Sequence, residues 1–162
     1  MSQRSRTYSW EDPMASAEAV GNMSGLEFVK AIFDGRIPPP PITATLNFTG
    51  AEAVEGKVVF VGDPAEFLYN PIGTVHGGWA MTMLDSAMGC AVQTTLAAGE
   101  RYTTLDVSVN FVRPITTETG RVRCEGTVLH RGGTVATAEG RLIAESSGKL
   151  LAHGTTTCLV IR

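Results

Sequence analysis

The sequence predicts an α+β fold, in which an antiparallel sheet of five to six strands wraps around one long central helix. Residues 79–96 contain no proline and one glycine among mostly alanine, methionine and leucine, a composition typical of a long buried helix. After Gly99, segments with alternating apolar and polar residues are separated by glycine-containing turns, as in antiparallel strands. An apolar helix needs a surface to pack on, and a sheet with one apolar face needs a cover, so we expect the two to pack together.

The composition fits one globular domain in a reducing compartment. Of 162 residues, 43% are apolar and 18% charged, and the net charge of −3 gives no indication of a nucleic-acid partner. No apolar run is long enough to cross a bilayer, so we expect no membrane partner. The first 13 residues lack the apolar core of a secretory signal. The three cysteines, Cys90, Cys124 and Cys158, are predicted to be buried thiols, which favours a cytoplasmic location.

The N-terminal part divides into an arm and a short helix. Residues 1–22 mix polar and small side chains and are predicted to form a flexible arm, with residues 23–162 as the single domain. Ser24 and Glu27 have the spacing of a capping box, which predicts a helix over residues 24–34 that ends at Gly35. The prolines at 38–41 forbid continuation of this helix and predict an extended linker.

The strands are expected on both sides of the long helix. Before it, residues 42–48 and 55–61 form strand-like segments, and residues 65–69 form a short third one. After it come residues 104–112, 120–130, 134–146 and 149–162, with hairpin turns at residues 131–133 and 146–149. Regular alternation over residues 104–112 would place Thr104 and Asp106 on one face and Leu105 on the other. The free edges of such a sheet need protection, which an oligomer would supply.

Asp85 is the unusual residue of the long helix. It is the only charged residue between Asn70 and Ala98, and no lysine or arginine lies three or four positions away. Burying a carboxylate is costly unless it is paired, so Asp85 lies either on a solvated face or in a pocket that uses it. Gly77 and Gly78 precede the helix and would present free N–H groups to a phosphate or to an oxyanion. These groups lie roughly 10 Å from Asp85, so a second chain or a folded loop would have to join them in one site.

The order of these features resembles the hotdog-fold acyl-CoA thioesterases, the group of PaaI-like and 4-hydroxybenzoyl-CoA thioesterases. The resemblance covers about residues 42–162. Its motif is Asn-x-x-Gly-x-x-His-Gly-Gly over residues 70–78, followed by an acid at Asp85 and by the segment 103–114, which ends in Arg-Pro. His-Gly-Gly alone is weak evidence, whereas the whole set at these spacings is fairly specific.

This resemblance implies an acyl-CoA thioesterase that acts as a homodimer or homotetramer with its active sites between protomers. Asp85 of one chain would be the general base or the nucleophile, and the N–H of Gly77 in the other chain would polarise the thioester carbonyl. His76 and Asn70 would orient the substrate or the water, unless they only bond to their own turn. Thr104 falls where relatives often carry a serine or threonine near the acid. The reaction requires no metal or other cofactor.

The expected substrate contacts are less specific. Gly78 and Trp79 at the start of the helix, together with Arg113 and Arg131, are candidates for binding an acyl-CoA, the two arginines through the phosphates. Each arginine could instead be an ordinary surface charge. Two other functions remain open: a non-catalytic acyl-CoA sensor of the same fold and, with weaker support, a dehydratase or hydratase. An acid in the pocket argues against the sensor.

Overall fold

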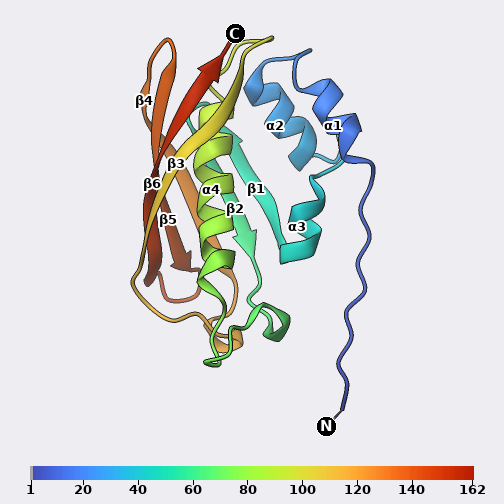
Figure 1. Cartoon of the computed structure of the whole chain (residues 1–162), viewed down its shortest axis with the longest axis vertical. Helices are drawn as coiled ribbons and strands as arrows, with labels where there is room; N and C mark the ends of the chain where they lie inside the picture. The colour runs from blue at the N-terminus through green and yellow to red at the C-terminus, as the bar shows by residue number, and fades with distance from the viewer. Residues whose placement is uncertain (1) are drawn as a thin grey trace.

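The computed structural model describes residues 2–162 and contains one six-stranded antiparallel sheet (Figure 1). The strand order is β1-β2-β4-β5-β6-β3, so β1 and β3 form the two edges. The strands are β1 (Phe48–Val54), β2 (Lys57–Gly62), β3 (Arg101–Phe111), β4 (Val122–Arg131), β5 (Val135–Ala144) and β6 (Leu150–Ile161). The α-helices are α1 (Pro13–Ala19), α2 (Gly25–Phe33), α3 (Pro41–Leu46) and α4 (Gly77–Gln93), and 3₁₀ turns occupy Glu66–Leu68 and Thr117–Thr119.

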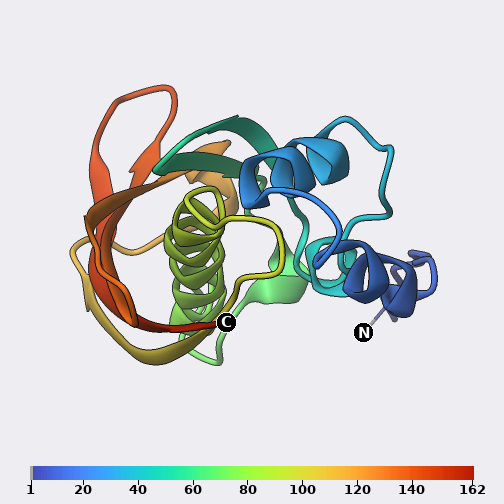
Figure 2. The ribbon, with the colours of Figure 1, turned by 90° about the horizontal axis from the view of Figure 1, so that it is seen from above.

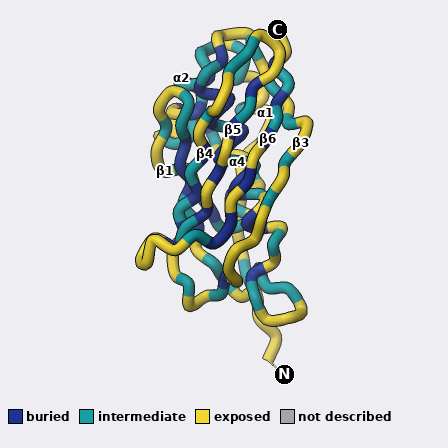
Figure 3. Tube along the Cα trace, turned by 90° about the vertical axis from the view of Figure 1, so that its left-hand side faces the viewer, coloured by how far each residue is buried: buried dark blue, intermediate teal, exposed yellow. Residues whose placement is uncertain are grey.

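The sheet curves around α4, which confirms the predicted fold class (Figure 2). The apolar side chains that α4 buries recur as neighbouring pairs every four residues, the spacing of one face of a helix. They are Trp79, Ala80, Met83, Leu84, Ala87, Met88, Ala91 and Val92. The sheet approaches the helix backbone closely at Gly126 of β4, where an added Cβ would lie 2.2 Å from the carbonyl oxygen of Ala87. Figure 3 shows buried and exposed residues alternating along β4, β5 and β6, as expected for strands with one face on the core.

The three short helices lie together on the side of α4 that the sheet leaves open (Figure 2). The predicted capping box of α2 is confirmed, because Ser24 accepts a bond from the Glu27 N–H and the Glu27 carboxylate accepts from the Ser24 N–H. The two predicted hairpin turns are also confirmed, since they join β4 to β5 and β5 to β6. None of the helices within residues 2–162 is long and apolar enough to cross a membrane.

Two predicted strands are wrong. Most of residues 42–48 form α3, because Pro41 occupies a first-turn position where its missing N–H costs nothing. Asn47 ends this helix in the left-handed conformation, with φ of 58°, and the first strand starts only at Phe48. Residues 65–69 contain a 3₁₀ turn instead of a strand, although Tyr69 forms an isolated bridge with Val75.

The N-terminal arm contains a helix that the sequence did not predict. Asp12 caps α1 by accepting a hydrogen bond from the Met14 N–H, and Pro13 stands at its first position. Before α1, the Arg6 guanidinium donates to the carbonyl oxygens of Ala44 and Thr45 near the end of α3. The flexibility of residues 1–22 stays a prediction.

Candidate active site

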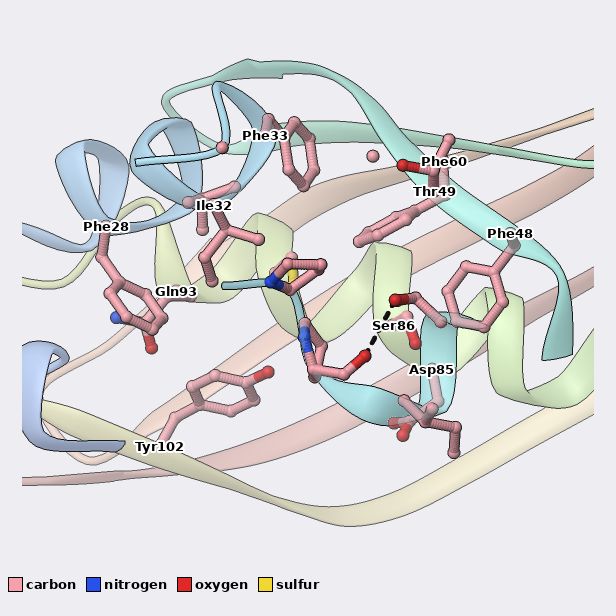
Figure 4. A pocket seen from close by; sticks show the side chains of 18 residues that line it. Phe28, Ile32, Phe33, Phe48, Thr49, Phe60, Asp85, Ser86, Gln93 and Tyr102 are labelled. Carbon is pink, nitrogen blue, oxygen red and sulfur yellow. Dashed lines mark hydrogen bonds between the residues drawn. The ribbon is translucent and has the colours of Figure 1, made fainter. Parts of the chain in front are cut away.

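Asp85 lies midway along α4 and lines a cavity of about 360 Å³ (Figure 4). Its carboxylate oxygen Oδ1 accepts a hydrogen bond from the Thr104 hydroxyl of β3 at 3.2 Å. Asp85 is half-buried, and no salt bridge within residues 2–162 involves it. It is the only charged side chain among the described residues that line the cavity. The carboxylate is therefore oriented by a hydroxyl and is not neutralised by a cation.

A bulge in β3 places Thr104 against Asp85. The pairing of β3 with β6 shifts between Thr104 and Asp106, so the extra residue Leu105 is left over. Thr104 is half-buried, whereas Leu105 is 60% exposed and Asp106 is also exposed. The regular alternation that we expected for this strand is wrong at this point. The bulge separates Thr104 and Asp106 onto different faces and turns the Thr104 hydroxyl toward the helix.

The cavity is walled by four aromatic rings of α2, β1 and β2 and by one side of α4. The rings of Phe33 and Phe48 each pack edge-on against Phe60, with centroids 5.3 and 5.6 Å away. Near α4, burial and the charge of Asp85 raise the pKa of the Cys90 thiol to about 12. Burial raises the pKa of the Tyr102 hydroxyl as well. Both groups stay neutral near pH 7, so the cavity is largely apolar. The lining residues from these elements are Phe28, Val29, Ile32, Phe33, Phe48, Thr49, Gly50, Phe60, Asp85, Ser86, Cys90 and Gln93, with Tyr102 from β3.

The turn before α4 lines a second cavity, of about 330 Å³, with Asn70, His76 and Gly77 in its wall. Asn70 braces this turn with its side chain. Its Oδ1 accepts from the N–H groups of Ile72 at 3.0 Å and Thr74 at 3.2 Å, and its Nδ2 donates to the Thr74 hydroxyl at 2.9 Å. The turn therefore holds the start of α4 in a fixed position.

His76 is the N-cap of α4. Its Nδ1 accepts a hydrogen bond from the Gly78 N–H at 2.9 Å, which puts the proton of the neutral ring on Nε2. A Cβ at Gly78 would lie 2.9 Å from that nitrogen, so the cap requires glycine there. The Gly77 N–H has no acceptor among residues 2–162. This leaves Gly77 with a free donor at the positive end of the helix.

Asp85 and the 70–78 turn do not meet within one chain. They line two different cavities, and Gly77 and Asp85 are eight positions apart, roughly 12 Å along the helix axis. A single protomer therefore holds two halves of the expected site at separate places.

The other expected binding residues fall elsewhere. Trp79 is 3% exposed, donates from Nε1 to the carbonyl of Leu46 at 2.6 Å, and lines neither cavity. Arg113 lines the second cavity and donates to the carbonyl of Leu150 at 2.6 Å. Arg131 lines neither cavity either, and its guanidinium forms an ion pair with Glu100 at 2.8 Å. Of the two arginines, only Arg113 borders the half-site formed by the turn.

Sequence reasoning missed most of the cavity that Asp85 faces. The phenylalanines come from three different elements, α2, β1 and β2, and nothing in their local pattern connects them. Gln93 could have been found, because Asp85, Gly89 and Gln93 follow one another at four-residue intervals and so lie on one face of the helix. Predicting that Tyr102 faces the cavity requires the position of the β3 bulge, which sets the face that Tyr102 and Thr104 occupy relative to the rest of the strand.

Comparisons with known proteins identify the family of the chain. The model of the Thioesterase superfamily matches residues 72–151, which include Gly77, Asp85 and Thr104. Human acyl-coenzyme A thioesterase 13 is 30% identical over 111 residues, which are 68% of this chain and 78% of that protein. A Halobacterium salinarum protein, provisionally named an esterase, is 36% identical over 69 residues, 41% of this chain and only 44% of its own length.

A solved structure extends the likeness to three dimensions. The phenylacetic acid degradation-related protein of Ralstonia eutropha JMP134 superimposes with a TM-score of 0.72 at 28% identity, covering 81% of this chain and 98% of that one. The sheet around α4 and the sequence matches thus indicate the same family. The chain belongs to the thioesterase superfamily of hotdog-fold proteins.

Proposed function

We propose that the protein hydrolyses the thioester of an acyl- or aryl-acyl-CoA to the free acid and CoA. This proposal rests on the Asp85 carboxylate, which accepts a hydrogen bond from the Thr104 hydroxyl at the wall of a largely apolar cavity. An oriented carboxylate beside a space for an apolar acyl group is what attack on a thioester needs. Membership of the thioesterase superfamily supports this reading.

The reaction has two possible courses at Asp85. As general base, Asp85 takes a proton from water while the water oxygen attacks the thioester carbonyl carbon. The tetrahedral intermediate then collapses, the C–S bond breaks, and the CoA thiolate leaves and takes up the proton. As nucleophile, the carboxylate itself attacks, the thiolate leaves, and water cleaves the resulting anhydride. Since a thiolate departs easily, neither course demands a strong acid at the leaving group.

The Gly77 N–H is the proposed donor to the oxyanion. It has no acceptor among residues 2–162, and it stands at the positive end of the 17-residue helix α4. A preorganised N–H aimed at the developing negative charge stabilises the transition state more than the ground state. His76 would orient the substrate or the water through its Nε2–H, since its Nδ1 is occupied by the Gly78 N–H. Asn70 would keep the whole turn in place.

The two half-sites require two copies of the chain. We propose a homodimer in which β3, an edge strand, lies beside the β3 strand of the partner and so brings Asp85 of each chain to the 70–78 turn of the other. The β3 edge carries the exposed apolar side chains Leu105 and Phe111, and Phe111 also packs next to Gly77. Such an edge is a ready template for pairing with another strand. Two of these dimers could further form a tetramer.

The test is thiol release from a panel of acyl-CoA thioesters with the wild type and with Asp85→Asn. The asparagine keeps the shape and removes the charge, so kcat should fall about a hundredfold or more. Asp106→Asn is the matched control, because Asp106 lies on the exposed face of the same strand as Thr104. If the wild type binds the thioesters but does not hydrolyse them, the proposed hydrolase activity is contradicted and an acyl-CoA sensor is favoured. Unchanged turnover in Asp85→Asn would place the chemistry on another residue.

A further inference from the structure

Two polar side chains at the far end of the Asp85 cavity have no hydrogen-bond partner within the described part of the chain. Gln93 is 5% exposed, and Tyr102 is half-buried. Both residues line the cavity, and Figure 4 shows them on one side of the view with Asp85 on the other. Thr43, the other buried polar residue among the described residues of the lining, is satisfied, since its hydroxyl donates to the carbonyl of Pro40 at 2.8 Å.

Unpaired polar groups in such a place point to a ligand. A buried amide or hydroxyl that is left without a partner costs free energy, so native proteins pair nearly all of them. An entirely apolar acyl chain would enclose Gln93 and Tyr102 and leave both unpaired. A ligand group that could both donate and accept would satisfy them.

The Tyr102 hydroxyl lies against a glycine of α4, Gly89. An added Cβ at Gly89 would lie 2.5 Å from that oxygen, so the hydroxyl rests against the bare backbone of α4. Gly89 is one turn beyond Asp85, and Gln93 is one turn beyond Gly89. Along the helix axis, Gly89 therefore lies roughly 6 Å from Asp85, and Gln93 lies roughly 12 Å from it. The polar positions form a line that leads away from the carboxylate.

The ligand group has to be neutral. Among the described residues that line this cavity there is no lysine, arginine or histidine, and the one charge is the Asp85 carboxylate. A carboxylate on the ligand would be desolvated without a cation to pair with it, and an ammonium group would bind at Asp85 rather than at the far end. The Gln93 amide offers a donor and an acceptor, and the Tyr102 hydroxyl does the same. A hydroxyl group matches both.

We propose that the cavity selects an acyl group that is apolar along its length and carries a hydroxyl at the end remote from the thioester, bound by Gln93 and Tyr102. This inference rests on the proposed function, because it takes Asp85 as the place of the thioester. The roughly 12 Å between the levels of Asp85 and Gln93 is covered by an extended chain of about eight to ten bonds. An 8-hydroxyoctanoyl group has this reach.

The test compares binding of two CoA thioethers, 8-hydroxyoctyl-CoA and octyl-CoA, by isothermal titration calorimetry on the full-length protein. Thioethers cannot be hydrolysed, so binding is measured apart from catalysis. The hydroxylated compound should bind the wild type at least tenfold more tightly, because a site built to hydrogen-bond a hydroxyl rejects the analogue without it. Tyr102→Phe and Gln93→Met, which keep the side-chain size, should each reduce this ratio, and the double variant should abolish it. Tyr8→Phe, on the exposed arm, is the matched control and should leave the ratio unchanged.

Octyl-CoA binding as tightly as 8-hydroxyoctyl-CoA in the wild type would overturn the inference, and so would failure of both to bind. Thermal melting of each variant shows whether a lost preference reflects lost folding, and an unchanged ratio in folded Tyr102→Phe and Gln93→Met would also contradict the assignment. Hydrolysis of octanoyl-CoA and 8-hydroxyoctanoyl-CoA is measured separately. If the thioesters are hydrolysed but the hydroxylated compound binds no more tightly, the hydroxyl-binding site is contradicted and the proposed hydrolysis is not. If the hydroxylated compound binds more tightly but no thioester is hydrolysed, the hydroxyl-binding site is supported and the proposed hydrolysis is contradicted.

Discussion

The hydrogen bond from the Thr104 hydroxyl to Asp85 fixes the carboxylate that the proposed reaction uses. It is the one polar contact of this carboxylate among residues 2–162. Thr104→Val removes the hydroxyl with little change of shape, so we predict a fall in kcat of about tenfold, within the range of a hydrogen bond to a charged group. Steady-state thiol release measures this effect.

The neighbouring residue gives a control for that prediction. Thr103 is exposed, so Thr103→Val makes the same chemical change away from the carboxylate and should leave kcat near the wild-type value. Both variants should melt close to the wild type, since valine suits a strand as well as threonine does. Equal turnover in the two variants would mean that Thr104 does not position Asp85.

Among the elements, α4 and β4 come into backbone contact at Gly126. A Cβ there would lie 2.2 Å from the Ala87 carbonyl oxygen, so Gly126→Ala has to push the helix from the sheet. We predict a loss of about 1–3 kcal/mol in the free energy of unfolding, the usual cost of overpacking. Gly133→Ala is the control, because the nearest atom to its added Cβ is 4.0 Å away. Urea unfolding of both proteins checks this, and equal stability would contradict the close approach.

Elements with strong local signals could be predicted from the sequence. The Ser24–Glu27 capping box and the glycine-containing hairpin turns encode their structure in neighbouring residues, and both are confirmed. Residues 42–48 misled because their alternation suits a strand, while Pro41 and the left-handed Asn47 make them a helix. The start of α4 lay two residues earlier than the composition suggested, at Gly77, because His76 supplies the cap.

The candidate site was predictable in its chemistry but not in its shape. The isolated charge of Asp85 stood out in the sequence, and so did the glycines before the helix. The contact between Asp85 and Thr104 depends on the bulge at Leu105, a register shift set by pairing with β6 and not by local sequence. The aromatic cavity depends on tertiary packing of α2, β1 and β2, which no local pattern encodes.

At the scale of the whole molecule, the proposed dimer depends on the exposed edge of β3. Leu105→Lys places a charge on this edge, and lysine is a residue that natural edge strands use to prevent pairing. We predict that the dimer dissociation constant rises at least tenfold, as measured by sedimentation velocity over a dilution series. Leu129→Lys, on the interior strand β4 with a similarly exposed side chain, should leave the dimer intact. A dimer unaffected by Leu105→Lys would place the interface elsewhere.

In the proposed dimer, Asp85 of one protomer acts with the 70–78 turn of its partner. This arrangement is tested most directly by co-expressing Asp85→Asn with His76→Ser, in which serine keeps a helix cap but removes the imidazole. Each variant alone should be nearly inactive. In a mixed dimer one of the two sites combines both mutations, whereas the other site combines the intact Asp85 with the intact His76.

Random pairing makes about half of the dimers mixed, so we predict about one quarter of wild-type thioester hydrolysis in the co-expressed protein. Isolating the mixed dimer with two different affinity tags should raise this to about one half. Activity that stays at the level of the separate variants would contradict the shared site, because it would place Asp85 and His76 of each site in the same chain.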